Sequence, residues 1–305
     1  MSPSAALHDP IFRAYLGIVL GLLSGAGGVL ALLQWVFRIE LGNVWQTFRA
    51  WLWLAPLAAI FIFAGRVPFI LGVTAVGLLA AREFLRVSQL ADDRLLSGAV
   101  YLGIVLVGSA TFFRGNLETL PALTLGLLLL VPILRNRAEG EVRKISLGMI
   151  AFLLPGWMWG HLGLLANAPD AYGYLCFLIF ATEVTDVAAF TFGKIFGRHP
   201  LRSEISPRKT WEGALGALLV AMALPWLLHF SFPFFGALEL ISTGLIVGVG
   251  GPLGDLACSV LKRELRTKDW SNAIPGHGGI LDRIDSMIFV APLFMFMTAY
   301  YHPGR

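Results

Sequence analysis

Long apolar segments alternate with short polar connections over almost the whole chain. A helix needs about 20 predominantly apolar residues to cross a hydrocarbon layer of about 30 Å, and most of these segments reach or approach that length. They cover residues 14–33, 51–64, 67–81, 95–113, 117–134, 145–166, 171–196, 211–230, 237–261 and 283–300. The pattern predicts an all-α polytopic membrane protein with about nine to ten transmembrane helices.

The segments 51–64 and 67–81 are shorter than the others, and only Gly65 and Arg66 separate them. They fit a tight transmembrane hairpin, or one crossing followed by a helix lying at the membrane interface. The two alternatives give ten and nine crossings, and the sequence leaves the choice open.

Composition indicates the same class of protein. The chain is 57% hydrophobic and 14% charged, whereas about a quarter of a typical soluble protein is charged. No repeat or soluble domain interrupts the pattern, and we expect no nucleic-acid partner. We therefore interpret the chain as one integral membrane unit, with N-terminal transmembrane helices of unassigned role in residues 1–170. Residues 171–305 are expected to form a C-terminal region whose polar motif loops face the cytoplasm and make it the candidate catalytic part.

Two further features of the sequence bear on the cellular setting. Cys176 and Cys258 both lie in apolar segments without a pairing pattern, so we expect packing thiols. The first ten residues carry no positively charged region, and we expect no cleavable signal peptide.

Basic residues are concentrated on one side of the predicted helices. With ten spans, the connections after the odd-numbered spans and their edges hold all but four of the 23 Lys and Arg residues. The exceptions are Arg13, Arg66, Arg114 and Arg305. Because cytoplasmic loops carry the excess of Lys and Arg, the connections 197–210 and 262–282 are predicted to face the cytoplasm. We expect an integral protein of a bacterial inner (plasma) membrane.

Acidic residues flank the second of these connections. Asp255 and Ser259 are four residues apart, and Asp282 precedes Asp285 and Ser286 by three and four residues. Residues so spaced share one face of a helix. If the two helices pack together, three carboxylates converge at the membrane edge, and such a cluster needs a cation. Hard oxygen ligands suit Mg²⁺, and a second cation is left open.

A glycine-rich turn, Pro275-Gly276-His277-Gly278-Gly279, lies in the same connection. Its backbone N–H groups have few side chains in the way, as close approach to a phosphate chain requires. His277 either donates to a phosphate or caps the loop. The basic residues around the turn are Lys262, Arg263, Lys268 and Arg283. Carboxylates, a metal and phosphate-binding cations together indicate phosphoryl or nucleotidyl transfer.

Each feature has a simpler explanation when taken alone. Lys262 and Arg263 are typical of a membrane anchor, and an aspartate in a membrane helix often hydrogen-bonds a neighbouring helix. The hypothesis of an active site rests on the joint occurrence of all these features between Asp255 and Ser286.

The connection 197–210 ends in a second polar motif, Ser206-Pro207-Arg208-Lys209-Thr210. Thr210 is the predicted N-cap of a helix that begins at Trp211. Arg208 and Lys209 would then lie beside a helix N-terminus, which attracts anions. The alternative is a basic loop that only anchors the start of the helix.

Two acids, Glu183 and Asp186, lie inside the apolar segment 171–196. Acids at such positions are costly and are commonly functional. Asp186 is predicted to line the nucleotide or metal cavity, and Glu183 either shares that role or only hydrogen-bonds a neighbouring helix.

These motifs resemble those of the phosphatidate cytidylyltransferases, also called CDP-diacylglycerol synthases. The family signature is matched by Ser259-x-Leu261-Lys262-Arg263-x4-Lys268-Asp269-x-Ser271-x2-Ile274-Pro275-x-His277-Gly278-Gly279-Ile280-x-Asp282-Arg283-Ile284-Asp285. A second box is similar in Ser206-Pro207-Arg208-Lys209-Thr210-Trp211-Glu212-Gly213, and a third element in Asp186-x2-Ala189-Phe190-x2-Gly193-Lys194, with Phe190 where tyrosine is usual. The resemblance covers residues 180–290.

The resemblance implies the reaction CTP + phosphatidate → CDP-diacylglycerol + pyrophosphate, with Mg²⁺ bound by Asp255, Asp282 and Asp285. These three aspartates with Lys262 and Arg263 form the expected catalytic set. The expected substrate-binding residues are Ser206, Arg208, Lys209, Thr210, Ser259, Lys268, His277, Gly278, Gly279, Arg283 and Asp186. The expected partners are CTP, phosphatidate and the lipid bilayer. Homodimer formation and the acyl preference are left open.

Two other functions remain as alternatives at this stage. A CTP-dependent lipid kinase would transfer the γ-phosphate to a lipid alcohol, and it would need a base for that hydroxyl. A transporter or membrane scaffold would carry the same charged loops without turning over CTP.

Overall fold

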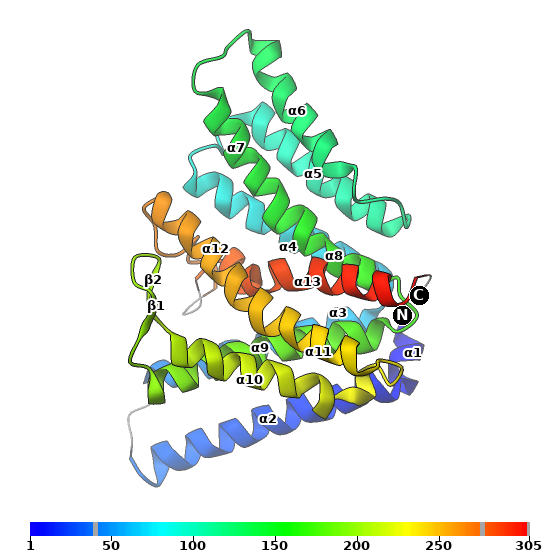
Figure 1. The fold of residues 1–305 in the computed structure, drawn as a ribbon, viewed down its shortest axis with the longest axis vertical. Coiled ribbons are helices and arrows are strands. Elements are labelled where there is room, and N and C mark those ends of the chain that lie inside the picture. Colours follow the sequence, from blue (N-terminus) through cyan, green and yellow to red (C-terminus); the bar gives the residue numbers. More distant parts are fainter. Residues whose placement is uncertain (39–41, 275–277, 304–305) are drawn as a thin grey trace.

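The computed structural model describes residues 1–38, 42–274 and 278–303. Helices dominate it (Figure 1). They are α1 (Pro3–His8), α2 (Pro10–Trp35), α3 (Gly42–Ala64), α4 (Arg66–Val87), α5 (Arg94–Phe112), α6 (Leu120–Arg135), α7 (Glu141–Phe152), α8 (Trp159–Leu165), α9 (Ala171–Phe196), α10 (Trp211–Leu227), α11 (Ala237–Leu245), α12 (Gly251–Glu264) and α13 (Leu281–Tyr301). Two short strands, β1 (Pro200–Arg202) and β2 (Ser206–Thr210), form an antiparallel hairpin between α9 and α10.

Two π-helical segments join helices end to end. Leu153–Met158 connects α7 to α8, and Ile246–Gly250 connects α11 to α12. Each joined pair therefore continues as one helix long enough to cross a membrane, Glu141–Leu165 and Ala237–Glu264.

The predicted class, an all-α polytopic membrane protein, is confirmed. Over the described residues, 7 helices are long and apolar enough to cross a membrane. Three shorter apolar helices, Phe48–Ala64, Leu120–Arg135 and Trp211–Leu227, fill the remaining predicted spans. Together they correspond to the ten apolar segments of the sequence.

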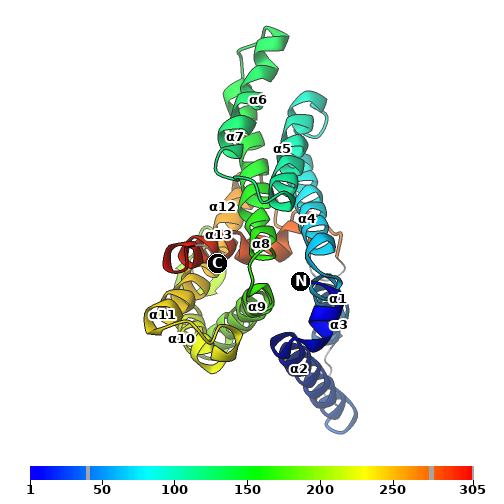
Figure 2. The same ribbon diagram turned by 90° about the vertical axis from the view of Figure 1, so that its right-hand side faces the viewer.

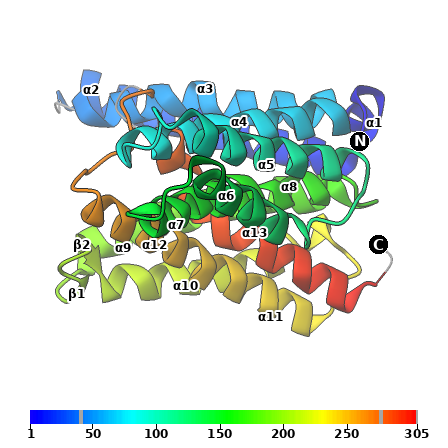
Figure 3. The same ribbon diagram turned by 90° about the horizontal axis from the view of Figure 1, so that it is seen from above.

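The structure also decides how segments 51–64 and 67–81 are arranged. They form two separate helices, α3 and α4, and the chain reverses direction at Gly65 (Figure 3). Gly65 has a φ of 101°, and a Cβ atom there would lie 3.1 Å from Cα of Ser2. Because only glycine adopts this conformation without strain, the hairpin depends on Gly65.

The polar connections fall at two ends of the helix assembly. The β-hairpin and the connections 88–93, 136–140 and 265–274 all lie at the left in Figure 1, whereas the connection 113–119 lies at the right. Most of the basic residues therefore gather at one end, together with the motif loops.

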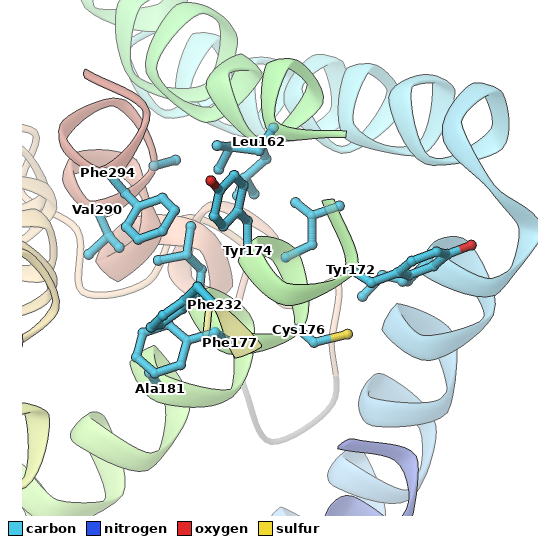
Figure 4. Packing of buried hydrophobic residues seen from close by; sticks show 14 of the residues in the cluster. Leu162, Tyr172, Tyr174, Cys176, Phe177, Ala181, Phe232, Val290 and Phe294 are labelled. Atoms are coloured by element: carbon cyan, nitrogen blue, oxygen red, sulfur yellow. The ribbon is translucent and has the colours of Figure 1, made fainter. Parts of the chain in front are cut away.

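Two clusters of buried side chains hold the helices together. The first gathers around Tyr174, Phe177, Phe232 and Phe294, which come from α9, the connection after α10, and α13 (Figure 4). The second contains residues from α4, α5, α6, α7, α12 and α13, and it includes Trp270. Both clusters draw side chains from before and after residue 170, so the N-terminal and C-terminal helices share their packing.

Helix α13 contributes to both clusters and packs between α12 and α8 (Figure 2). It approaches α12 so closely that a Cβ atom on Gly254 would collide with the backbone carbonyl of Asp285. This contact fixes the relative position of the two helices that carry the predicted acidic residues.

Candidate active site

A pocket of about 360 Å³ lies between the β-hairpin and the C-terminal end of α12. Small-molecule sites commonly measure about 300–1,000 Å³. The pocket is lined by Ser206, Pro207, Arg208, Ser259, Lys262, Arg263, Lys268 and Asp269. Four of these residues are cations, so the pocket suits a polyanion. It brings together two motifs that are about 50 residues apart in the sequence, one in β2 and one at the end of α12.

The β-hairpin is fixed beside α12 by two polar contacts. Lys209 Nζ lies 2.5 Å from Asp255 Oδ2, and Arg263 Nε donates a hydrogen bond of 3.2 Å to the carbonyl oxygen of Ile205. Ser259 Oγ donates to Asp255 Oδ1 at 3.3 Å, one turn along the same helix. The predicted sharing of a helix face by Asp255 and Ser259 is confirmed.

The N-terminus of α10 lies directly after the β-hairpin and borders the site. Thr210 Oγ1 accepts a hydrogen bond of 3.1 Å from the N–H group of Gly213, which confirms its predicted role as the N-cap. Arg208 is exposed beside it, and Lys209 is half-buried. This part of the site therefore combines a helix N-terminus with two cations, an arrangement that attracts phosphate groups.

Asp282 organises the loop before α13. Its Oδ1 accepts a hydrogen bond of 2.7 Å from Lys262 Nζ. Its Oδ2 accepts from the N–H groups of Trp270 at 3.0 Å and Gly279 at 2.9 Å. The carboxylate thus holds Lys262 at the pocket wall and ties Trp270 and Gly279 to the first turn of α13.

Asp285 lies deeper, one turn along α13, and is buried. Its Oδ1 accepts a hydrogen bond of 2.9 Å from the N–H group of Ser286. Ser286 Oγ in turn donates to Asp186 Oδ2 at 2.9 Å, which places Asp186 of α9 at the same junction. The negative charges of Asp255 and Asp186 both act on Asp285. Within the described parts of the chain, no ion pair neutralises Asp285.

These contacts bear on the expected Mg²⁺ site. No group of three or more His, Cys, Asp or Glu side chains in the described residues is arranged to hold a metal ion. Magnesium in nucleotide enzymes is usually bound by one or two carboxylates, with waters and substrate phosphates completing the shell. Asp255 and Asp285 fit that requirement, because they are neighbouring hard-oxygen ligands on packed helices. Asp255 and Asp282 each contact a lysine, Lys209 and Lys262, which the metal would have to displace. The assignment of all three aspartates as metal ligands stays a prediction.

The glycine-rich turn is only partly described, and His277 lies outside the described residues. Gly278 has a φ of 79°, and a Cβ atom there would lie 2.8 Å from Asp282 Oδ2. The N–H group of Gly279 is bonded to Asp282. In this structure the two glycines therefore allow the loop to fold closely around its own carboxylate. Their predicted contact with substrate stays a prediction.

Two of the expected binding residues lie at the border of the site. Arg283 is exposed at the first turn of α13, and its positive charge acts on Asp285 and Asp186. Lys268 lines the pocket from the connection after α12.

Sequence reasoning missed Glu83, which lies in α4 and contacts the loop before α13. Its carboxylate accepts hydrogen bonds from Ser271 Oγ and from the N–H groups of Ile280 and Leu281. One signal was available, since Glu83 is the only acidic residue in the 22-residue helix α4. Its target, however, lies almost 200 residues further along the chain.

Comparison with known proteins gives consistent matches. The model of the family described as Cytidylyltransferase family matches residues 45–301. A phosphatidate cytidylyltransferase of Bacillus subtilis (strain 168) is 33% identical over 263 residues, which cover 81% of this chain and 95% of the relative. A phosphatidate cytidylyltransferase of Staphylococcus haemolyticus (strain JCSC1435) is 31% identical over 251 residues, with 79% and 95% covered. Uncharacterized protein YnbB of Escherichia coli (strain K12) is 28% identical over 264 residues, with 85% and 88% covered. The family match includes every site residue described above.

Proposed function

This chain belongs to the cytidylyltransferase family, and from that premise we propose that it transfers the cytidylyl group of CTP to phosphatidate. The products are CDP-diacylglycerol and pyrophosphate. The observation that carries the proposal is the pocket lined by Arg208, Lys262, Arg263 and Lys268. This cationic pocket lies directly beside the carboxylates of α12 and α13, as a site for a nucleoside triphosphate and its metal requires.

The reaction needs no strong general base. A phosphate monoester has its second pKa near 6 and is largely ionised at pH 7, so the lipid phosphate brings its own nucleophilic oxygen. That oxygen forms a bond to the α-phosphorus of CTP, and the bond between the α-phosphorus and the bridging oxygen to the β-phosphate breaks. Pyrophosphate leaves with the bonding electrons. The site must mainly position two anions and neutralise their charge.

The residues divide this work between them. The pocket cations Arg208, Lys262, Arg263 and Lys268 bind and orient the phosphates of both substrates. Asp255 and Asp285 would hold Mg²⁺, and a metal ion bound there would supply positive charge that offsets the negative charge of the phosphates. Asp282 keeps Lys262 directed at the pocket through the 2.7 Å contact.

The lipid substrate reaches the pocket from the side. The helices that carry the site expose apolar side chains outward, including Val187 and Phe190 on α9, Leu215 on α10 and Leu253 on α12. Bilayer acyl chains are therefore in contact with the same helices that position the polar pocket. The diacyl chains of phosphatidate stay in the membrane while its phosphate enters the cationic site.

Labelled CTP tests this function directly. Purified protein with Mg²⁺ and phosphatidate is expected to move label from the α-phosphate of CTP into lipid, whereas γ-label leaves as pyrophosphate. Diacylglycerol in place of phosphatidate should give no labelled lipid, because it lacks the nucleophilic phosphate. Transfer of γ-label to diacylglycerol would identify a lipid kinase instead.

The proposal places the pocket on the cytoplasmic side of a bacterial plasma membrane, because that end carries most of the Lys and Arg residues. We expect single cysteines at Ser203 and Asn272, both exposed, to react with an impermeant thiol reagent only after the cells are opened. Glu118→Cys, at the opposite end of the helices, should react in intact cells. The native Cys176 and Cys258 are buried and provide a low background. The reverse labelling pattern would contradict the orientation.

A further inference from the structure

Glu83 makes an unusual set of contacts for an acid on a membrane helix. The residue is only 7% exposed. Its Oε1 accepts hydrogen bonds from Ser271 Oγ at 2.5 Å and from the N–H group of Ile280 at 2.9 Å. Its Oε2 accepts from the N–H group of Leu281, also at 2.9 Å. Burying a carboxylate is costly, and three donors from one distant segment offset that cost.

Two of these donors belong to the start of α13. The first N–H groups of a helix have no partner within the helix and are normally capped by a nearby side chain. At α13 the N-cap residue is Ile280, whose side chain cannot accept a hydrogen bond. Glu83 takes that role from α4, so the position of α13 depends on a helix of the N-terminal third.

The glycine pair before α13 fits the same interpretation. A Cβ atom on Gly279 would lie 2.6 Å from Glu83 Oε2, and one on Gly278 would lie 2.8 Å from Asp282 Oδ2. The two carboxylates therefore approach the turn at adjacent positions, and each needs the space that a glycine leaves. Side chains at these positions would push the loop away from both acids.

A short chain of contacts connects Glu83 to the pocket. Glu83 holds Ser271 and Ile280, and the flanking N–H groups of Trp270 and Gly279 hold Asp282. Asp282 in turn bonds Lys262. Beside Glu83, Phe84 packs against the Trp270 ring with 5.2 Å between ring centroids. Two consecutive residues of α4 thus support the segment that orients a pocket lysine.

We propose that Glu83 is a positioning residue of the active site, which fixes Ser271 and the start of α13 so that Asp282 holds Lys262 at the pocket. The expected effect on turnover rests on the proposed function, whereas the structural role of Glu83 does not. It gives the N-terminal helices a direct role in assembling the site.

The test compares Glu83→Gln, Glu83→Asp and the control Glu139→Gln. Glu139 is exposed in the connection 136–140 at the same end of the molecule, so its variant removes the same charge without touching the loop. Glutamine keeps the size of Glu83 but replaces one acceptor oxygen with a donor group. At least one of the three donors then loses its acceptor. Aspartate keeps the charge but is one methylene too short to reach both amides.

Hydrogen exchange of the detergent-solubilised protein is the first measurement. In Glu83→Gln we expect faster exchange in a peptide that covers residues 278–290, with unchanged protection in α9 and α10. Glu139→Gln should exchange like the wild type. Unchanged exchange in that peptide would overturn the proposal, as would an equal loss of protection throughout the protein, which would mean a general structural role.

Kinetics supply the second measurement. We expect Glu83→Gln to lower kcat/KM for CTP by about 10- to 100-fold, since loss of a hydrogen bond to a charged group and misplacement of catalytic groups have effects of that order. Glu83→Asp should recover part of the loss, and it serves as the test variant if Glu83→Gln does not fold. Wild-type kinetics in a variant with altered exchange would also overturn the proposal. If the wild type itself transfers no α-label, the proposed function fails, and hydrogen exchange still decides the structural role of Glu83.

Discussion

Replacing Asp255 by asparagine is expected to lower cytidylyl transfer by at least about 1,000-fold, because a bound metal contributes several kcal/mol of charge stabilisation in such reactions. Asp255 is one of two neighbouring carboxylates proposed to hold Mg²⁺, and it also positions Lys209 at 2.5 Å. The variant loses both functions while keeping the size of the side chain. The measurement is the incorporation of α-label from CTP into lipid over a range of Mg²⁺ concentrations.

Asp92→Asn is the matched control for this prediction. Asp92 is exposed in the connection 88–93 at the same end of the molecule and does not line the pocket, so its substitution removes an equal charge without altering the pocket wall. We expect near-wild-type activity from it. If Asp255→Asn also kept near-wild-type activity at saturating Mg²⁺, the metal assignment would be wrong.

Asp282→Asn is expected to damage both stability and turnover, and a second substitution should separate the two effects. Asp282 and Lys262 form an ion pair whose side chains are 7% and 12% exposed. Removing one partner of a buried pair typically costs about 3–5 kcal/mol, since the remaining charge is left without compensation. The single variant should therefore unfold at a clearly lower temperature in detergent, and its turnover should fall by about 100-fold or more.

The double variant Asp282→Asn/Lys262→Met removes the unpaired charge as well. Replacing both partners of a buried ion pair by uncharged side chains is often close to neutral, so we expect the unfolding temperature to return toward that of the wild type. Turnover should stay low, because the pocket has lost Lys262. Recovery of activity together with stability would show that the pair serves only the fold.

The helices follow from the sequence because each depends mainly on its own residues. An apolar segment long enough to span the hydrocarbon layer becomes a helix, because a helix satisfies all the backbone hydrogen bonds within the segment itself. The N-cap role of Thr210 is equally local, as the side chain bonds an N–H group three residues away. The motif in residues 259–285 likewise allowed the family to be identified before the structure.

Local patterns also explain how much of the candidate site could be outlined from the sequence. Asp255 and Ser259 share a helix face because of helical periodicity alone. The cations of two motifs were expected near phosphate, and the structure places four of them in one pocket.

Pairing between distant residues could not be predicted in this way. The sequence grouped Asp255, Asp282 and Asp285 as one acidic cluster, whereas the structure pairs Asp255 with Lys209 and Asp282 with Lys262. Which cation meets which carboxylate depends on the close approach of α12 to α13 and on the fold of the hairpin. Periodicity specifies the face of a helix, but it does not specify the neighbour that the face meets.

Glu83 shows this limit most clearly. Its hydrogen bonds join residues separated by 188 to 198 positions in the sequence, and a single acid in an apolar helix does not reveal its partner. The sequence by itself determined the membrane class, the helices and the motif residues, because those depend on local composition and spacing. Only the tertiary structure decided which helix caps α13, because that contact exists only once α4 and α13 pack around a shared core.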